Sequence, residues 1–198
     1  LREPLEPGKS LVLDVVWDDT LPSIVERTGF DGTFHFVGQW FPKLAKLEPD
    51  GTFAHFPFHH LAEFYSDFGT YDVTVDVPAG YLVAATGPSV STKDEGGRHV
   101  ERHVQAEVHD FAFGAFDTFE RADETLDGVK VSFFYPRGYA GAAARERDAL
   151  AFAIPHFRSL YGKYPYETLS VVHPPNKDRE AGGMEYPTLI TTGGPWHG

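Results

Sequence analysis

The segment 181–187, Ala-Gly-Gly-Met-Glu-Tyr-Pro, combines two glycines with a single carboxylate just before an apolar stretch. Glycines let a second backbone approach closely. An extended peptide can therefore pair with such a segment while Glu185 binds a cation. The alternative is a glycine turn followed by a solvated glutamate. Short glycine motifs are common, so the local residues by themselves favour the turn.

Ten histidines raise the question of a metal site. His55 and His59 have the i, i+4 spacing of two ligands on one helical turn, and His60 follows. Pro57 between them disfavours a helix, so loop histidines are the simpler interpretation and no metal ligand is predicted. Three other histidines are expected to be strand residues that face solvent: His35, His99 and His103.

The remaining sequence contains no complete catalytic apparatus. His109 and Asp110 form either a buried pair that orients a strand or a catalytic dyad, but no nucleophile lies near them in sequence. There is no H-E-x-x-H zinc motif, no G-x-S-x-G nucleophile elbow and no G-x-x-x-x-G-K phosphate loop. The chain has no cysteine, which excludes disulfides, thiol catalysis and thiolate metal sites.

Composition excludes several classes of partner. Lys and Arg number 17 and Asp and Glu 29, a formal charge of −12, which disfavours nucleic acids and anionic membranes. No run of 18 apolar residues is present, so no transmembrane segment is predicted. The chain has 198 residues and 41% hydrophobic residues, enough for one large domain or two small ones. Its loop-like ends, without an initiating Met or a signal pattern, suggest a piece of a longer protein.

The pattern of apolar residues predicts a mainly β protein with an α+β C-terminal part. Residues 71–77 alternate between polar and apolar side chains, the period of a half-buried strand. Short apolar or aromatic runs bounded by Gly and Pro predict further strands, at 11–17, 33–40, 81–86, 98–104, 107–116, 129–135, 168–173 and 188–192. Many short strands with frequent turns indicate an antiparallel sheet or sandwich.

One long helix is expected within residues 140–162, after the pattern changes near residue 120. Four apolar residues follow helical spacing and predict one buried stripe: Leu150, Ile154, Phe157 and Tyr161. Pro155 lies inside the helix and is expected to kink it or restart it.

The segment 182–185, Gly-Gly-Met-Glu, resembles the Gly-Ala-Met-Glu-Asn exopeptidase motif of the aminopeptidase N-like family of zinc metallopeptidases. Residues 154–165 and 169–172 are similar to the helix, Tyr-Pro and strand that lead into that motif. Residues 109–113 resemble the strand that joins the family's first two domains. Residues 38–43, Gly-Gln-Trp-Phe-Pro-Lys, resemble a bacterial branch of the family. Together these segments extend over nearly the whole chain.

The resemblance implies a fragment of two domains. Residues 1–120 would be part of an N-terminal all-β saddle domain, and 121–198 the truncated, β-rich start of a thermolysin-like catalytic domain. The parent would be a zinc-dependent aminopeptidase that hydrolyses peptides from the amino terminus. Its H-E-x-x-H helix and third zinc ligand would follow this chain, so the fragment alone is expected to bind no zinc and to be inactive.

The same resemblance implies substrate-binding roles. Glu185 would bind the free α-ammonium group of a peptide, and Gly182, Gly183 and Met184 would line the extended substrate. Gln39 matches a Gln that the N-terminal domain contributes to the first subsite. Tyr186 departs from the family pattern, because it stands where the motif has Asn.

A second hypothesis remains open: a non-catalytic β-rich binding or scaffold module from a family member without a zinc site. The expected partners are peptide substrates and the missing remainder of the catalytic domain. The residues do not fix the compartment. Resemblance to the bacterial branch implies the cell envelope or periplasm, and the cytoplasm stays open.

Overall fold

The computed structural model describes residues 4–23, 25–57, 65–175 and 181–193. Its first sheet has four antiparallel strands in the order β1-β2-β7-β4. These strands are β1 (Thr28–Asp31), β2 (Phe34–Val37), β7 (Phe113–Phe116) and β4 (Leu82–Ala85). Asp31 and Phe34 are joined by a tight turn through Gly32, whose φ of 57° suits a residue without Cβ.

A second antiparallel sheet has the order β3-β6-β5. It consists of β3 (Gly69–Pro78), β6 (Arg98–Val108) and β5 (Ser89–Glu95). The side chains of β3 alternate between exposed and less exposed positions, as the sequence predicts. On the outer face, Arg102 of β6 makes two hydrogen bonds to the carboxylate of Asp72 of β3, so cross-strand ion pairs cover that face.

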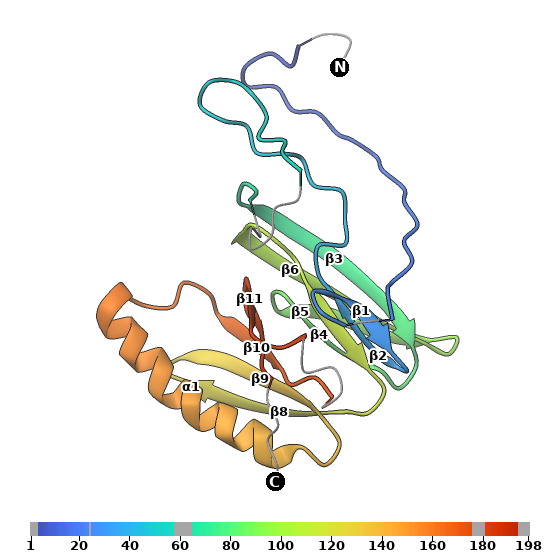
Figure 1. Ribbon diagram of the computed structural model, residues 1–198, viewed down its shortest axis with the longest axis vertical. Helices are drawn as coiled ribbons and strands as arrows, with labels where there is room; N and C mark the ends of the chain where they lie inside the picture. Colours follow the sequence, from blue (N-terminus) through green and yellow to red (C-terminus); the bar gives the residue numbers. More distant parts are fainter. Residues whose placement is uncertain (1–3, 24, 58–64, 176–180, 194–198) are drawn as a thin grey trace.

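The third sheet is mixed and has the order β11-β12-β10-β9-β8. Its strands are β8 (Phe119–Leu126), β9 (Val129–Pro136), β10 (Thr168–Val172), β11 (Met184–Tyr186) and β12 (Leu189–Thr191). Strand β10 runs parallel to both β9 and β12. The long helix α1 (Ala140–Tyr161) connects β9 to β10 and lies against one face of this sheet (Figure 1).

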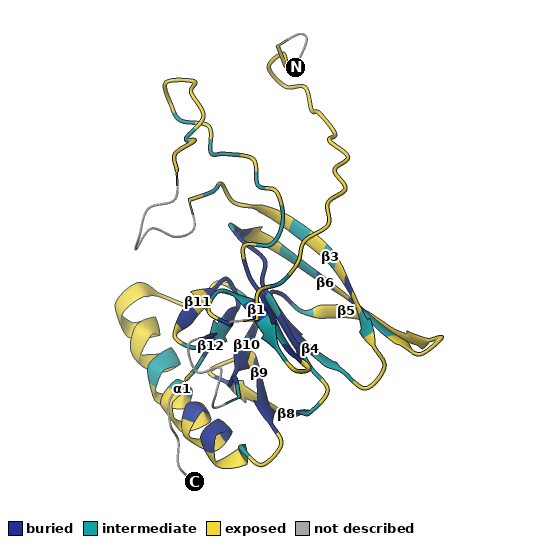
Figure 2. Cartoon of the chain, turned by 45° about the vertical axis from the view of Figure 1, so that its right-hand side comes forward, coloured by how far each residue is buried: buried dark blue, intermediate teal, exposed yellow. Residues whose placement is uncertain are grey.

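A shared hydrophobic core lies between the four-stranded and the five-stranded sheets. Phe34 and Phe36 of β2 belong to the same buried cluster as Met184, Tyr186 and Leu189 of the last two strands. Figure 2 shows these buried segments gathered at the centre of the molecule. The five-stranded sheet begins within two residues of the predicted boundary at residue 120. The division into two domains there stays a prediction.

The predicted fold class is confirmed: the protein is mainly β, with one helix in its C-terminal third among the described residues. Helix α1 ends at Tyr161, and Gly162, with φ of 92°, follows it. Helix α1 includes Pro155 and does not restart there, and that residue lies on its exposed side.

The strand predicted at 11–17 is wrong. These residues are extended but belong to no sheet, and Val16 is 95% exposed. Figure 1 shows this N-terminal segment projecting away from the sheets. Apolar, β-branched composition favours a strand only where another strand can satisfy the backbone, and no described strand pairs with this segment.

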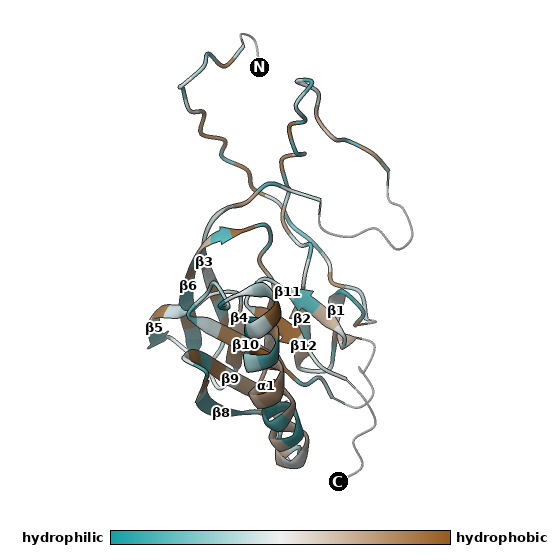
Figure 3. Cartoon of the chain, turned by 90° about the vertical axis from the view of Figure 1, so that its left-hand side faces the viewer, coloured by the Kyte–Doolittle hydropathy of each residue, from teal (hydrophilic) through white to brown (hydrophobic). Residues whose placement is uncertain are grey.

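The buried face of α1 also differs from the predicted stripe. Its buried positions are Ala142, Ala143 and Glu146, near its start. Leu150 and Ile154 pack partly against the sheet, whereas Phe157 and Tyr161 are 54% and 82% exposed. Figure 3 views α1 from outside the sheet, with apolar and polar segments along it. The second half of the helix therefore extends beyond the sheet that its first half covers.

Candidate functional site

Glu185 lies at the middle of β11, the edge strand of the five-stranded sheet. Side chains alternate along a strand, and here Met184 and Tyr186 are buried while Glu185 is exposed. Strand β11 pairs with β12 on one side, and no described strand pairs with its other side. The free edge therefore offers backbone N–H and C=O groups beside an exposed carboxylate.

The two glycines before β11 fit closely against β12. A Cβ atom on Gly182 would lie 2.3 Å from the carbonyl oxygen of Thr192, so only glycine can occupy this position. Gly183 has φ of 78° and its amide donates to the carbonyl oxygen of Thr191 at 2.9 Å. Glycine is thus required at position 182 because the backbone of Thr192 in the same chain lies so close to it. Gly183 is exposed, and the position of a Cβ there is open.

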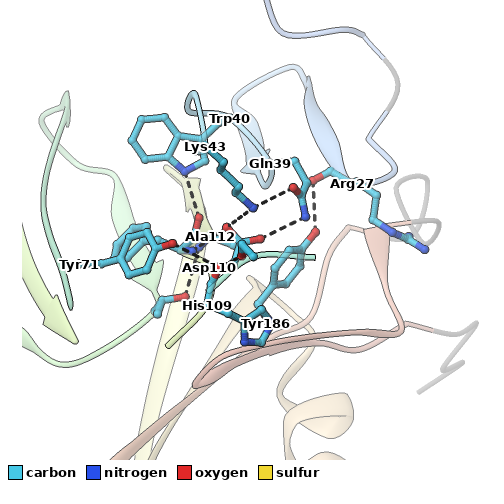
Figure 4. Close-up of polar contacts among 12 residues, drawn as sticks. Arg27, Gln39, Trp40, Lys43, Tyr71, His109, Asp110, Ala112 and Tyr186 are labelled. Atoms are coloured by element: carbon cyan, nitrogen blue, oxygen red, sulfur yellow. Dashed lines mark hydrogen bonds and ion pairs between the residues drawn. The ribbon is translucent and has the colours of Figure 1, made fainter. Parts of the chain in front are cut away.

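Tyr186 joins this edge to the first sheet. Its ring packs on Phe36 with 5.6 Å between centroids, and its hydroxyl lies 3.4 Å from the carbonyl oxygen of Arg27. A Cβ atom on Gly38 would lie 2.6 Å from the same hydroxyl. The large side chain of Tyr186 therefore contacts Gly38, and Figure 4 shows the neighbouring Gln39 close to Tyr186.

Two side chains, those of Asp110 and Lys43, hold Gln39 in place (Figure 4). Its Nε2 donates to Oδ2 of Asp110 at 3.1 Å, and its Oε1 accepts from Nζ of Lys43 at 2.9 Å. Lys43 also forms a 2.8 Å ion pair with Oδ1 of Asp110. Gln39 has φ of 54°, a left-handed conformation that costs a non-glycine residue about 1–3 kcal/mol unless its surroundings stabilise it.

Asp110 is the centre of this arrangement and is completely buried. Besides Gln39 and Lys43, the backbone amide of Phe111 donates to its Oδ1 at 2.8 Å. The pKa of Tyr71 is raised, first by burial and then by the negative charge of Asp110. Of the predicted His109–Asp110 pair, Asp110 is buried and makes these orienting contacts, whereas His109 is half-buried.

A groove of about 450 Å³ opens beside Glu185, on the α1 side of the sheet. Its walls are mostly apolar and come from the second half of α1 and the loop that follows. The side chains that line it include Ile154, Phe157, Tyr161 and Tyr164. Glu185 is the acidic residue in the lining of this groove, so the carboxylate lies at the rim of an apolar surface.

The histidines divide into two kinds. His55 is exposed and its Nδ1 lies 2.9 Å from the carbonyl oxygen of Phe53, while His59 and His60 lie outside the described residues. His103 does not face solvent as expected: it is 4% exposed, on the inner face of β6. Side chains alternate along β6 so that positions 101 and 103 are buried, and the inward position of residue 103 buries its imidazole although it is polar. Within the described ranges, no three His, Asp or Glu side chains are grouped to hold a metal ion.

No protein-family model matches the chain, and no curated protein gives a significant match. Among the described residues, no helix has both the length and the apolar character needed to cross a membrane.

Four of the five predicted site residues, Gly182, Gly183, Met184 and Glu185, are consecutive in the chain, and Met184 is buried whereas Glu185 is exposed. The structure adds Gln39 to their surroundings, because Gly38 next to it contacts Tyr186. Sequence reasoning missed Lys43 and the contact of Asp110 with Gln39. The contact joins residues 71 positions apart, so no local pattern signals it.

Proposed function

We propose that this chain is the substrate-amine-recognising part of a zinc-dependent aminopeptidase of the aminopeptidase N-like family. The observation that carries the proposal is the exposed carboxylate of Glu185 at the centre of a free-edged strand, directly after two glycines. The contact of Tyr186 with Gly38 supports it, because it holds Gln39 close to this strand.

The chemistry of the edge suits the end of a peptide. An extended peptide adds to a free strand edge through main-chain hydrogen bonds, which do not depend on its sequence. A carboxylate beside that edge binds an ammonium group through charge-assisted hydrogen bonds, which are stronger than neutral ones. Glu185 would therefore select peptides whose first residue carries a free amine. Gln39 would offer one amide oxygen or N–H group to the bound peptide.

No H-E-x-x-H motif occurs in the sequence, and the described residues contain no three-ligand group. The proposal therefore assigns the zinc ligands to the rest of the parent protein. Phe157 and Tyr161 expose apolar surface in the groove between Glu185 and the second half of α1. This exposed surface supports the proposal that the rest of the parent protein packs there.

The test is a comparison of two substrates in the full-length protein. Glu185→Ala should lower kcat/KM for a free-amino peptide by about 10- to 150-fold, the factor that corresponds to about 1.5–3 kcal/mol for a hydrogen bond to a charged group. The N-acetylated form of the same peptide lacks the ammonium group, so its slow cleavage should change little. Glu185→Asp should fall between wild type and Glu185→Ala, because the charge stays and its reach shortens.

Equal losses on the free and acetylated peptides would show that Glu185 supports the loop and does not bind the amine. The coding sequence of the parent protein distinguishes the aminopeptidase from the alternative, a non-catalytic binding or scaffold module. The aminopeptidase proposal requires H-E-x-x-H within about 20–40 residues after Gly198 and a later Glu. A parent without that motif would exclude the enzyme and leave the module.

A further inference from the structure

A buried polar cluster joins α1 to the ends of β10 and β12, next to the loop that carries Gly182 and Gly183. Oε1 of Glu146, on α1, accepts hydrogen bonds from Oγ1 of Thr192 at 2.5 Å and from Nδ1 of His173 at 2.7 Å. His173 follows β10 and is 1% exposed, and Glu146 is buried on the face of α1 that covers the sheet. We call these three residues the Glu146 cluster.

The Glu146 cluster places a carboxylate at a buried position of α1. A buried carboxylate is costly unless hydrogen bonds and charge compensate it, and an apolar residue at the same place is often as stable or more so. The neighbouring buried positions of α1, Ala142 and Ala143, are apolar in the usual way. The carboxylate of Glu146 instead binds two groups that directly follow two different strands, β10 and β12, and so fixes the positions of those strand ends.

The strand end that Glu146 fixes is the one that supports the glycine loop. The carbonyl oxygen of Thr192 lies where a Cβ of Gly182 would clash. The preceding residue, Thr191, accepts the amide of Gly183 on its carbonyl oxygen at 2.9 Å and the amide of Met184 on its Oγ1 at 3.0 Å. A shift of Thr192 would therefore move the backbone of residues 182–184 directly.

We infer that Glu146, His173 and Thr192 are positioning residues for the peptide-binding edge. The inference rests on the proposed function, since it concerns the same edge. The Glu146 cluster does not touch the peptide. It holds Thr192, which holds the glycine loop, so that the main-chain groups before β11 keep the orientation that an extended peptide requires. Its loss weakens binding of the peptide main chain, whether or not the amine is free.

The experiment uses the hydroxyl of Thr192. Thr192→Val removes the donor to Glu146 and keeps the shape, and Thr192→Ser restores the donor. In the full-length peptidase, Thr192→Val should raise KM by about 2- to 12-fold for both the free and the acetylated peptide, the range that one neutral hydrogen bond implies. The kcat should stay within about twofold, because main-chain binding is equal in the ground and transition states.

The controls separate this role from general destabilisation. Thr192→Ser should recover the wild-type KM, and Thr125→Val, the same change at an exposed position of β8, should not alter it. In the 198-residue chain, hydrogen exchange at the amides of Gly183 and Met184 should be faster in Thr192→Val than in wild type or Thr192→Ser.

The outcomes distinguish the inference from the proposed function. An active peptidase in which Thr192→Val has wild-type kinetics overturns the positioning role and leaves the aminopeptidase standing. A full-length protein without peptidase activity overturns the proposed function. The exchange measurement then decides the positioning role alone, and unchanged exchange at Gly183 and Met184 rejects it.

Discussion

Glu101 lies on the inner face of β6, where a carboxylate is surrounded by core residues and two imidazoles. Its oxygens are 3.3 Å from Nε2 of His99 and 3.3 Å from Nε2 of His103. Nδ1 of His99 is 2.7 Å from the exposed carboxylate of Asp94 on β5, so carboxylates and imidazoles alternate across these two strands. Burial acts to raise the pKa of Glu101, but His103, Ser89 and His99 together outweigh burial and lower it to about 2.

This arrangement gives folding stability a defined pH dependence. A carboxylate whose folded pKa is depressed stabilises the folded state above its unfolded pKa, and the stabilisation is lost as pH falls through the folded pKa. For Glu101 the window runs from its ordinary value of 4.5 down to about 2. The contribution is on the order of 2–3 kcal/mol after allowance for screening by solvent.

His99 titrates in the opposite sense. The hydrogen bond with Asp94, opposed by burial and assisted by Glu101, raises the pKa of His99 above its ordinary value of 6.5. Its contribution is therefore complete below pH 6.5 and is lost as pH rises through the folded pKa. The charges along β6 thus stabilise the sheet most between pH 4.5 and 6.5.

Urea unfolding of the 198-residue chain, repeated in steps from about pH 5 to pH 2, tests this reasoning. The free energy of unfolding of wild type should fall by about 2–3 kcal/mol more than that of Glu101→Gln, which keeps the shape and removes the charge. Asp94→Asn, a matched change at an exposed carboxylate, should keep most of the wild-type dependence. Parallel pH curves for wild type and Glu101→Gln would refute the assignment.

Two further predictions concern the packing at the candidate site and the metal. Gly38→Ala would place a Cβ 2.6 Å from the hydroxyl of Tyr186 and 2.7 Å from the carbonyl oxygen of Arg27, so we expect a loss of about 1–3 kcal/mol in urea unfolding. Gly69→Ala, at a position with open space for a Cβ, is the control, and equal losses in both would contradict the contact. The purified 198-residue chain should contain no stoichiometric zinc, because a catalytic site needs three protein ligands and the ligand motif is absent from its sequence. Elemental analysis that finds one tightly bound zinc per chain would contradict this.

The sequence alone determined the elements whose signals are local. The alternation at 71–77 predicts β3, and the helical pattern before Gly162 predicts α1, because backbone propensity and periodicity act within a few residues. The segment 182–185 could be singled out for the same reason, since its glycines and carboxylate are adjacent in the chain. The resemblance of this segment to an exopeptidase motif rests on the identity and order of the same residues.

Only the tertiary structure decided which residues meet. Residues 11–17 have strand composition but pair with no described strand, and His103 is polar but faces the core. Gln39 and Asp110 are 71 residues apart, and they meet because β2 pairs with β7 in the first sheet. The hydroxyl of Thr192 reaches Glu146 because α1 packs on the five-stranded sheet. Pairing and burial depend on partners far away in the chain, and neither periodicity nor composition specifies those partners.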